Sequence, residues 1–425
     1  MQKKLIALTL MVLLSPTILL INFGQPLGES SSESAIYTYV AGGGSKATDY
    51  YVAAGFSSYP KSARFIGLLD GTWYQMGVQY GNKSADLIVA AFDGWIPEIG
   101  WDKAPFAHVK SDLAKYEKQI FYYAPELLQF MEGIADGAAS TLRKSRYAEY
   151  FTNYQMILII NCHTALAWRH PPPELHSEGC SSLAIVGTRG GAKGGETFFA
   201  HNRDSSFFPS LYLVSFVARP ADPKANTFSA VSTAGMIGRN AQNNKGLSIC
   251  HLAGGTKIKD YDFGVPYMVR IMKAIAYTDN TEDAIYMMTL GTPEYRAATG
   301  RKTLLREGDS NTIVADKVSC AVVELTAHWY SIRYPRNLGE IGNYIVATNH
   351  FCISWGSFDE NNTWHEDLGM TRFGDEVWSA NSANRFWTIM WNIKNNYGNI
   401  DLGKVNEFMS THYHIQKNGV RVDYY

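Results

Sequence analysis

The sequence has almost no net charge and few cysteines, and both shortages narrow the classes of protein that it can encode. Lys and Arg total 38 against 39 Asp and Glu, a net charge of −1. With no basic stripe, nucleic-acid binding is not expected as the main function. Five cysteines in 425 residues are too few for a disulfide scaffold, and no Cys-x-x-Cys spacing predicts a zinc or redox site.

Familiar phosphate-binding and metal-binding motifs are also missing. Residues 187–194 resemble a phosphate loop, but Ala192 stands before the lysine and no Ser or Thr follows it. His365 begins a zinc-peptidase pattern, but Gly369 occupies the position of the second ligand. We therefore expect neither a metal nor an organic cofactor.

The first 28 residues have the pattern of a secretory signal. Two lysines precede an apolar run over residues 5–23, and a polar stretch follows. We expect this segment to be removed on export, with an uncleaved N-terminal anchor as the alternative. Either outcome predicts a secreted or extracytoplasmic protein, and a retained segment would associate the chain with a membrane.

The rest of the chain divides into a helical part and a mixed part. Residues 29–60 read as a linker or arm, and apolar residues recur at helical spacing over 74–91, 110–142 and 147–168. Three prolines at 171–173 end the helical pattern. Short apolar runs then predict strands, and longer periodic segments predict helices. The strands are expected at 182–186, 197–200, 211–218, 247–252, 312–315, 321–325, 329–333 and 344–347, and the helices at 265–277, 281–290 and 381–394.

One cysteine stands where the helical pattern gives way to strands. Cys180 follows Gly179 and opens an apolar strand, and a glycine-rich turn leads to a second strand that ends at Asp204. Such a hairpin would bring Asp204 close to Cys180.

This placement suits an N-terminal nucleophile. A thiol attacks as its thiolate and needs a base. If the Gly179–Cys180 bond is cut, the new α-amine, with a reference pKa of about 7.7–8.0, can be that base. Asp204 would hold the amine in place. The local sequence is equally typical of a buried, unreactive thiol.

Further motifs resemble the N-terminal-nucleophile cysteine hydrolases, which include choloylglycine hydrolases, penicillin V acylase, acid ceramidase and the isopenicillin-N acyltransferase family. The similarity is closest to the last of these, whose members have a Gly-Cys-Thr/Ser start and an Asn-x-Asp after the first hairpin. The matching motifs run from about residue 69 to about residue 393. They are the propeptide-like segment 69–81, Gly179 to Ser181, Asn202 to Asp204, Asn243 to Leu247, Asn311 to Asp316 with Glu324, Thr348 with Asn349, and Ser382 with Arg385.

The resemblance implies a role for each catalytic position. Cys180 would be the nucleophile, freed by self-cleavage after Gly179. Asp204 would contact its amine, and the side chain of Asn349 would donate to the oxyanion. Arg385 would sit beside the nucleophile and stabilise its thiolate.

The supporting positions Asn202 and Asn243 match the family, but two others depart from it. Choloylglycine-type members have an arginine where this chain has His201, so that arginine's role passes to His201 or Arg203. No asparagine stands near the end of the strand after Leu247, so a second oxyanion donor would be a backbone N–H or His251.

The resemblance implies an α+β, four-layer αββα fold. Residues 61–179 would form a mainly helical propeptide, retained as a small subunit, and residues 180–425 the catalytic domain. The implied activity is hydrolysis or transfer of an acyl group from a linear, non-peptide amide, with a small-molecule N-acyl substrate. Three alternatives stay open: an ester hydrolase like the phospholipase B-like proteins, a secreted binding protein without activity, and a conventional cysteine peptidase with a separate catalytic histidine.

Overall fold

The computed structural model describes residues 17–23, 37–41, 64–98, 106–169, 179–204, 212–254, 260–352, 357–365, 380–411, 413–415 and 421–423. The helices are α2 (Trp73–Glu98), α3 (Phe106–Tyr123), α4 (Pro125–Gly137), α5 (Ala139–Leu142), α6 (Asn153–Arg169), α8 (Tyr267–Tyr277), α9 (Thr281–Leu290), α10 (Pro293–Thr299), α12 (Ala380–Asn395) and α13 (Leu402–Met409), with a 3-10 turn, η2, at Thr188–Gly190.

The strands of the first two-thirds of the chain are β1 (Thr17–Phe23), β2 (Tyr37–Ala41), β3 (Arg64–Gly71), β4 (Gly179–Val186), β5 (Thr197–Asp204), β6 (Leu213–Pro220), β7 (Phe228–Thr233), β8 (Asn240–Asn243) and β9 (Ser248–Ala253). The later strands are β10 (Ser310–Ala315), β11 (Cys320–Leu325), β12 (Tyr330–Arg333), β13 (Tyr344–Ala347), β14 (Ser357–Phe358), β15 (Trp364–His365), β16 (Tyr413–Ile415) and β17 (Arg421–Asp423).

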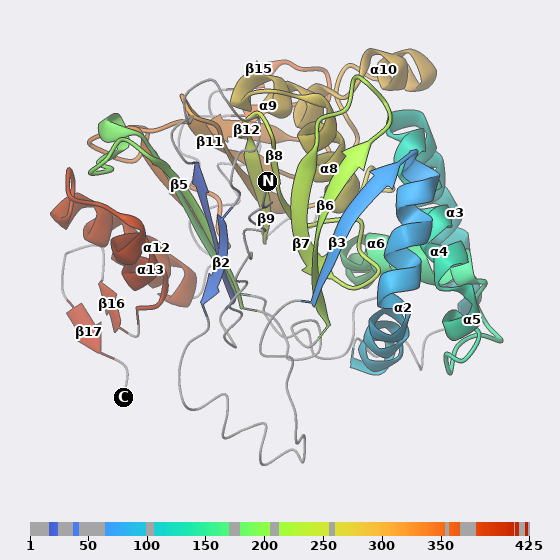
Figure 1. Ribbon diagram of the computed structural model, residues 1–425. Coiled ribbons are helices and arrows are strands. Elements are labelled where there is room, and N and C mark those ends of the chain that lie inside the picture. The colour runs from blue at the N-terminus through green and yellow to red at the C-terminus, as the bar shows by residue number, and fades with distance from the viewer. Residues whose placement is uncertain are drawn as a thin grey trace.

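Two large sheets stack face to face in the described part of the chain. One has five strands in the order β13-β4-β5-β1-β2, and the other has ten in the order β15-β14-β12-β11-β10-β9-β8-β7-β6-β3. Helices cover the outer face of each sheet, α12 and α13 on one side and α2 to α6 with α8 on the other (Figure 1). The order helix–sheet–sheet–helix confirms the predicted αββα fold class.

Alternation along β4 divides its side chains between two cores. Cys180 and Ala184 point into the layer between the sheets, where they meet Ile313 and Val322 of the ten-stranded sheet. Leu183, on the opposite face, packs under α12 and α13. Because the strand period is two, every second residue from Cys180 onward faces the other sheet.

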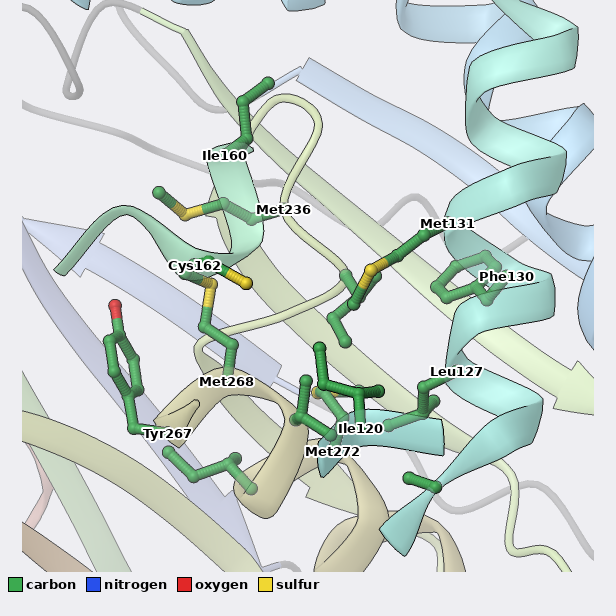
Figure 2. Packing of buried hydrophobic residues seen from close by; sticks show 14 of the residues in the cluster. Ile120, Leu127, Phe130, Met131, Ile160, Cys162, Met236, Tyr267, Met268 and Met272 are labelled. Atoms are coloured by element: carbon green, nitrogen blue, oxygen red, sulfur yellow. The ribbon is translucent and has the colours of Figure 1, made fainter. Parts of the chain in front are cut away.

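The outer face of the ten-stranded sheet is covered by helices from both sides of the predicted cleavage point. Ile120, Phe130 and Ile160 come from α3, α4 and α6, and they share one buried cluster with Met236 and Met272. Figure 2 shows these side chains meeting in a single apolar core. The region that precedes Cys180 is therefore an integral layer of this fold.

Glycines bring α2 and α4 unusually close. A Cβ added at Gly77 would lie 2.3 Å from the carbonyl oxygen of Phe130, and one added at Gly133 would lie 2.2 Å from that of Tyr74. No real Cβ tolerates such a contact, so only glycine permits this helix spacing. The propeptide-like segment 69–81 thus contributes the contact surface of α2.

One predicted helical segment is divided in the structure, and strands lie in three of the predicted regions. The single helix expected over 110–142 is three helices, because Pro125 has no backbone N–H to continue α3 and instead begins α4. The predicted helical propeptide also contains β3, which pairs in parallel with β6. Strand β1 falls within the predicted leader or anchor and β2 within the predicted linker. The leader itself stays a prediction.

Candidate active site

Cys180 lies at the start of β4 between two neighbouring chain segments. Arg203 of β5 is its direct register partner on one side. On the other side β13 pairs with β4 as far as Ala347 and Ser182, so Asn349 falls opposite Cys180 just beyond the last pair. The Cys180 side chain is fully buried.

The side chain of Asn349 takes the place of a ladder partner for Cys180. The backbone N–H of Cys180 donates to Asn349 Oδ1 at 2.6 Å. The Nδ2 of Asn349 donates to the backbone oxygen of Ala253 at 2.8 Å. Because an amide NH₂ carries two hydrogens, this contact leaves the second one for another acceptor. Asn349 therefore joins the nitrogen of Cys180 to the end of β9.

Arg385 reaches the same point from α12. Its Nη2 donates to Asn349 Oδ1 at 2.8 Å, and its Nη1 donates to Ser181 Oγ at 2.7 Å and to the backbone oxygen of Cys180. Two donors thus converge on Asn349 Oδ1, which fixes the amide orientation, since the reversed amide would set donors against donors. One guanidinium therefore contacts both the backbone oxygen of Cys180 and the side-chain amide of Asn349, which accepts from the Cys180 nitrogen.

Ser382 organises the turn that carries Asn349. It lies three residues before Arg385, and residues at this spacing share one face of a helix. Its Oγ accepts from the backbone N–H of Asn349 at 3.0 Å and lies 2.9 Å from Nδ1 of His350. Burial, with the nearby cations Arg333 and Arg385, lowers the pKa of His350 to about 4. His350 is therefore neutral near pH 7 and serves as a hydrogen-bonding wall.

A second polar cluster surrounds Ser182, which lies two residues after Cys180 on the same face of β4. Ser182 Oγ is 2.7 Å from Nδ1 of His201 and 3.1 Å from Sγ of Cys250. Burial, with a contribution from Cys180, raises the pKa of Cys250 well above its usual range. His201 is thus in contact with Ser182, whereas Arg203 is the residue directly across from Cys180.

The remaining residues of the Asn-x-Asp motif point elsewhere or lie partly outside the described atoms. Asn202 faces the helical layer, where its Nδ2 donates to the backbone oxygen of Met409 at 2.5 Å. The backbone of Asp204 pairs with Gly179, one residue before Cys180. The side chain of Asp204 lies outside what the structure describes, so its contact with the amine stays a prediction.

Two supporting candidates are not brought to Cys180. Asn243 closes the turn between β8 and β9, and its Nδ2 donates to the backbone oxygens of Ile275 and Thr278. His251 lies on the helical face of β9, stacked on Tyr267 at 3.6 Å between ring centroids. Strand alternation explains this placement, because Cys250 and Leu252 take the face toward Cys180. His251 is therefore no oxyanion donor in this arrangement.

The sequence motifs included Asn311 and Glu324, but no role at the turn around Asn349 was predicted for either residue. Asn311 and Glu324 are direct register partners on β10 and β11. Both are buried, and both contact the segment that follows Asn349. Burial raises the pKa of Glu324 to about 7, while Arg333 acts in the opposite direction. The signal in the sequence was a polar residue among the apolar residues of each strand, Asn311 in β10 and Glu324 in β11.

None of the five cysteines forms a disulfide. Within the described ranges, no group of three or more His, Cys, Asp or Glu side chains could hold a metal ion. None of the described helices combines the length and apolar character needed to cross a membrane.

No protein-family model and no curated protein matches the chain. The solved structures that resemble it include an N-acylethanolamine-hydrolyzing acid amidase ortholog from Caenorhabditis elegans, at 15% identity and a TM-score of 0.33, over 55% of this chain and 86% of that one. A mutant conjugated bile acid hydrolase from Clostridium perfringens also has 15% identity and a TM-score of 0.33, over 54% and 78%. Penicillin V acylase from Agrobacterium tumefaciens has 9% identity and a TM-score of 0.24, over 54% and 62%. At these values the assignment of the site rests on this chain's own geometry.

Proposed function

We propose that the protein is an amide hydrolase of the N-terminal-nucleophile class, activated when the chain is cut between Gly179 and Cys180. One observation carries the proposal. The nitrogen of Cys180 is held by Asn349 Oδ1, and Arg385 binds both the Cys180 carbonyl and the same amide oxygen. In a strand the acceptor for this nitrogen is ordinarily a backbone carbonyl. A side-chain amide oriented by an arginine suits a nucleophile that uses its own α-amine as base, because it can stay bonded to the nitrogen after the chain is cut.

Self-cleavage would begin with attack of Cys180 Sγ on the carbonyl carbon of Gly179. The C–N bond breaks, the thiol proton passes to the nitrogen of Cys180, which becomes an amine, and Gly179 is left as a thioester on Sγ. Water then hydrolyses the thioester and frees the thiol. The same groups would serve the mature enzyme, because the amine stays within reach of Asn349.

The mature reaction repeats this chemistry on a substrate amide. The α-amine of Cys180 takes the thiol proton as Sγ attacks the carbonyl, and it returns the proton to the leaving amine. The second N–H of Asn349 Nδ2 and a backbone N–H would stabilise the oxyanion, and one such donor can contribute about 10²–10³ in rate. Water releases the acyl group, or a competing amine or thiol accepts it, which gives acyl transfer of the isopenicillin-N acyltransferase type.

We further propose that the region before Cys180 stays bound after cleavage. Its helices share one apolar core with α8. The same region supplies β3 to the ten-stranded sheet. Release would expose that core to water, which is strongly unfavourable. The two fragments are therefore expected to behave as two subunits of one particle.

A panel of fluorogenic N-acyl amides and the matching esters tests the activity. The proposal predicts amide turnover that is lost in Cys180→Ala and after alkylation of the thiol. Cys320→Ala is the matched control, because Cys320 is equally buried in the same layer between the sheets. Turnover of esters alone would favour the lipid ester hydrolase, and turnover of neither by correctly folded protein would favour a binding protein.

A further inference from the structure

The turn that carries Asn349 is held from the opposite sheet by one side chain. Asn311 lies on β10 of the ten-stranded sheet, whereas Asn349 follows β13 of the five-stranded sheet. The Nδ2 of Asn311 donates to the backbone oxygen of Thr348 at 2.8 Å and to that of His350 at 2.9 Å. These carbonyls belong to the residues immediately before and after Asn349.

Both hydrogens of the Asn311 amide are thereby used on this turn. Only 1% of Asn311 is exposed, and in the described part of the chain its Oδ1 has no hydrogen-bond partner. A buried polar group without full pairing costs free energy, so the amide would not be retained in this layer for packing alone. Its contribution is the pair of contacts that fix the peptide units around Asn349.

The register partner of Asn311 extends this support along the turn. Glu324 lies directly across from Asn311 on β11, and its Oε1 accepts from the backbone N–H of Cys352 at 2.8 Å. Ala253, at the end of β9, accepts from Asn349 Nδ2. Three adjacent strands of one sheet therefore contact the segment from Thr348 to Cys352.

We infer that Asn311 is a positioning residue for the proposed reaction, which sets Asn349 against the nitrogen of Cys180 by clamping the carbonyls of Thr348 and His350. The inference rests on the proposed function and deepens it. Asn349 has to meet Cys180 and the oxyanion at hydrogen-bond distance, and a displacement of about 1 Å in such a group can cost about 10²-fold in rate. The clamp also makes the geometry of the site depend on how the two sheets are stacked.

The test compares Asn311→Ala with Thr312→Val. Thr312 is the next residue on β10, is equally buried and faces the helical layer, where its hydroxyl has no hydrogen-bond partner among the described residues. Hydrogen–deuterium exchange of the peptide that spans 344–352 reports the clamp, because the amide of Asn349 is bonded to Ser382 and that of Cys352 to Glu324. Steady-state kinetics on the fluorogenic N-acyl amide give kcat and KM separately.

We expect faster exchange in this peptide and a kcat lowered about 10²-fold at nearly unchanged KM in Asn311→Ala, with Thr312→Val close to wild type. Unchanged exchange in Asn311→Ala overturns the inference, and so does an equal loss of kcat in both variants. If wild-type protein turns over no amide while exchange still rises only in Asn311→Ala, the proposed function fails and the clamp on Asn349 stands.

Discussion

Replacing Arg385 by lysine separates the charge of this group from its geometry. Arg385 donates to Cys180, Ser181 and Asn349 from two nitrogens of one planar group. Lysine keeps the positive charge but presents a single nitrogen, which cannot reproduce the fork. At least one of the three contacts should therefore be lost.

The expected size of the effect follows from the value of one such contact. A hydrogen bond from a charged donor contributes about 1.5–3 kcal/mol, and partial exposure of Arg385 favours the lower end. A loss of about 1.4 kcal/mol is a factor of about ten, so kcat should fall about tenfold in Arg385→Lys. Arg385→Met removes all three contacts and the charge, and should lose about 10³-fold.

Kinetics on the N-acyl amide, together with the rate at which iodoacetamide alkylates Cys180 at pH 7, measure both effects. Alkylation should slow in Arg385→Met but not in Arg385→Lys, because a nearby cation favours the thiolate. The control is Arg296→Lys, since Arg296 is also partly exposed and donates to the backbone oxygens of Leu290 and Gly291. A wild-type kcat in Arg385→Lys would refute the importance of the fork.

Three further predictions concern neighbouring parts of the structure. Asn349→Asp keeps an acceptor for the Cys180 nitrogen but sets an oxygen against Ala253, so amide turnover should fall at least about 10²-fold, and a rate near wild type would contradict the role of Asn349. Gly133→Ala should lower the melting temperature, because overpacking between α2 and α4 costs about 1–3 kcal/mol. An unchanged melting temperature would mean that the two helices move apart at no cost. Folded Glu324 holds its proton up to a pKa of about 7 against 4.5 ordinarily, so wild-type stability should fall as pH rises between these values. Melts of Glu324→Gln should lack this fall, and the same pH dependence in both proteins would exclude Glu324 as its source.

The sequence sufficed for the features that local patterns encode. A glycine before a cysteine at the start of an apolar strand located the centre of the site, and Asn349 and Arg385 lie beside it although they are 169 and 205 positions away along the chain. The order of the matching motifs along the chain is what predicted that Asn349 and Arg385 lie beside Cys180.

The sequence could not predict which way individual side chains point, or which residues of one sheet support a turn of the other. Whether His251 or Cys250 faces Cys180 depends on the register of β9, and a shift of one residue reverses the answer. The contact of Asn311 with the turn around Asn349 depends on how two sheets stack, which no local pattern specifies. The break at Pro125 was readable, because proline cannot continue a helix without a kink or a new start.

The cut between Gly179 and Cys180 is the central claim, and mass spectrometry tests it most directly. Purified wild-type protein, Cys180→Ala and Cys320→Ala are compared by intact mass, N-terminal sequencing and size-exclusion chromatography. We predict that wild type and Cys320→Ala give a fragment beginning at Cys180 that co-elutes with the preceding helical fragment, while Cys180→Ala stays whole. A wild-type chain that folds and stays uncut would contradict the account.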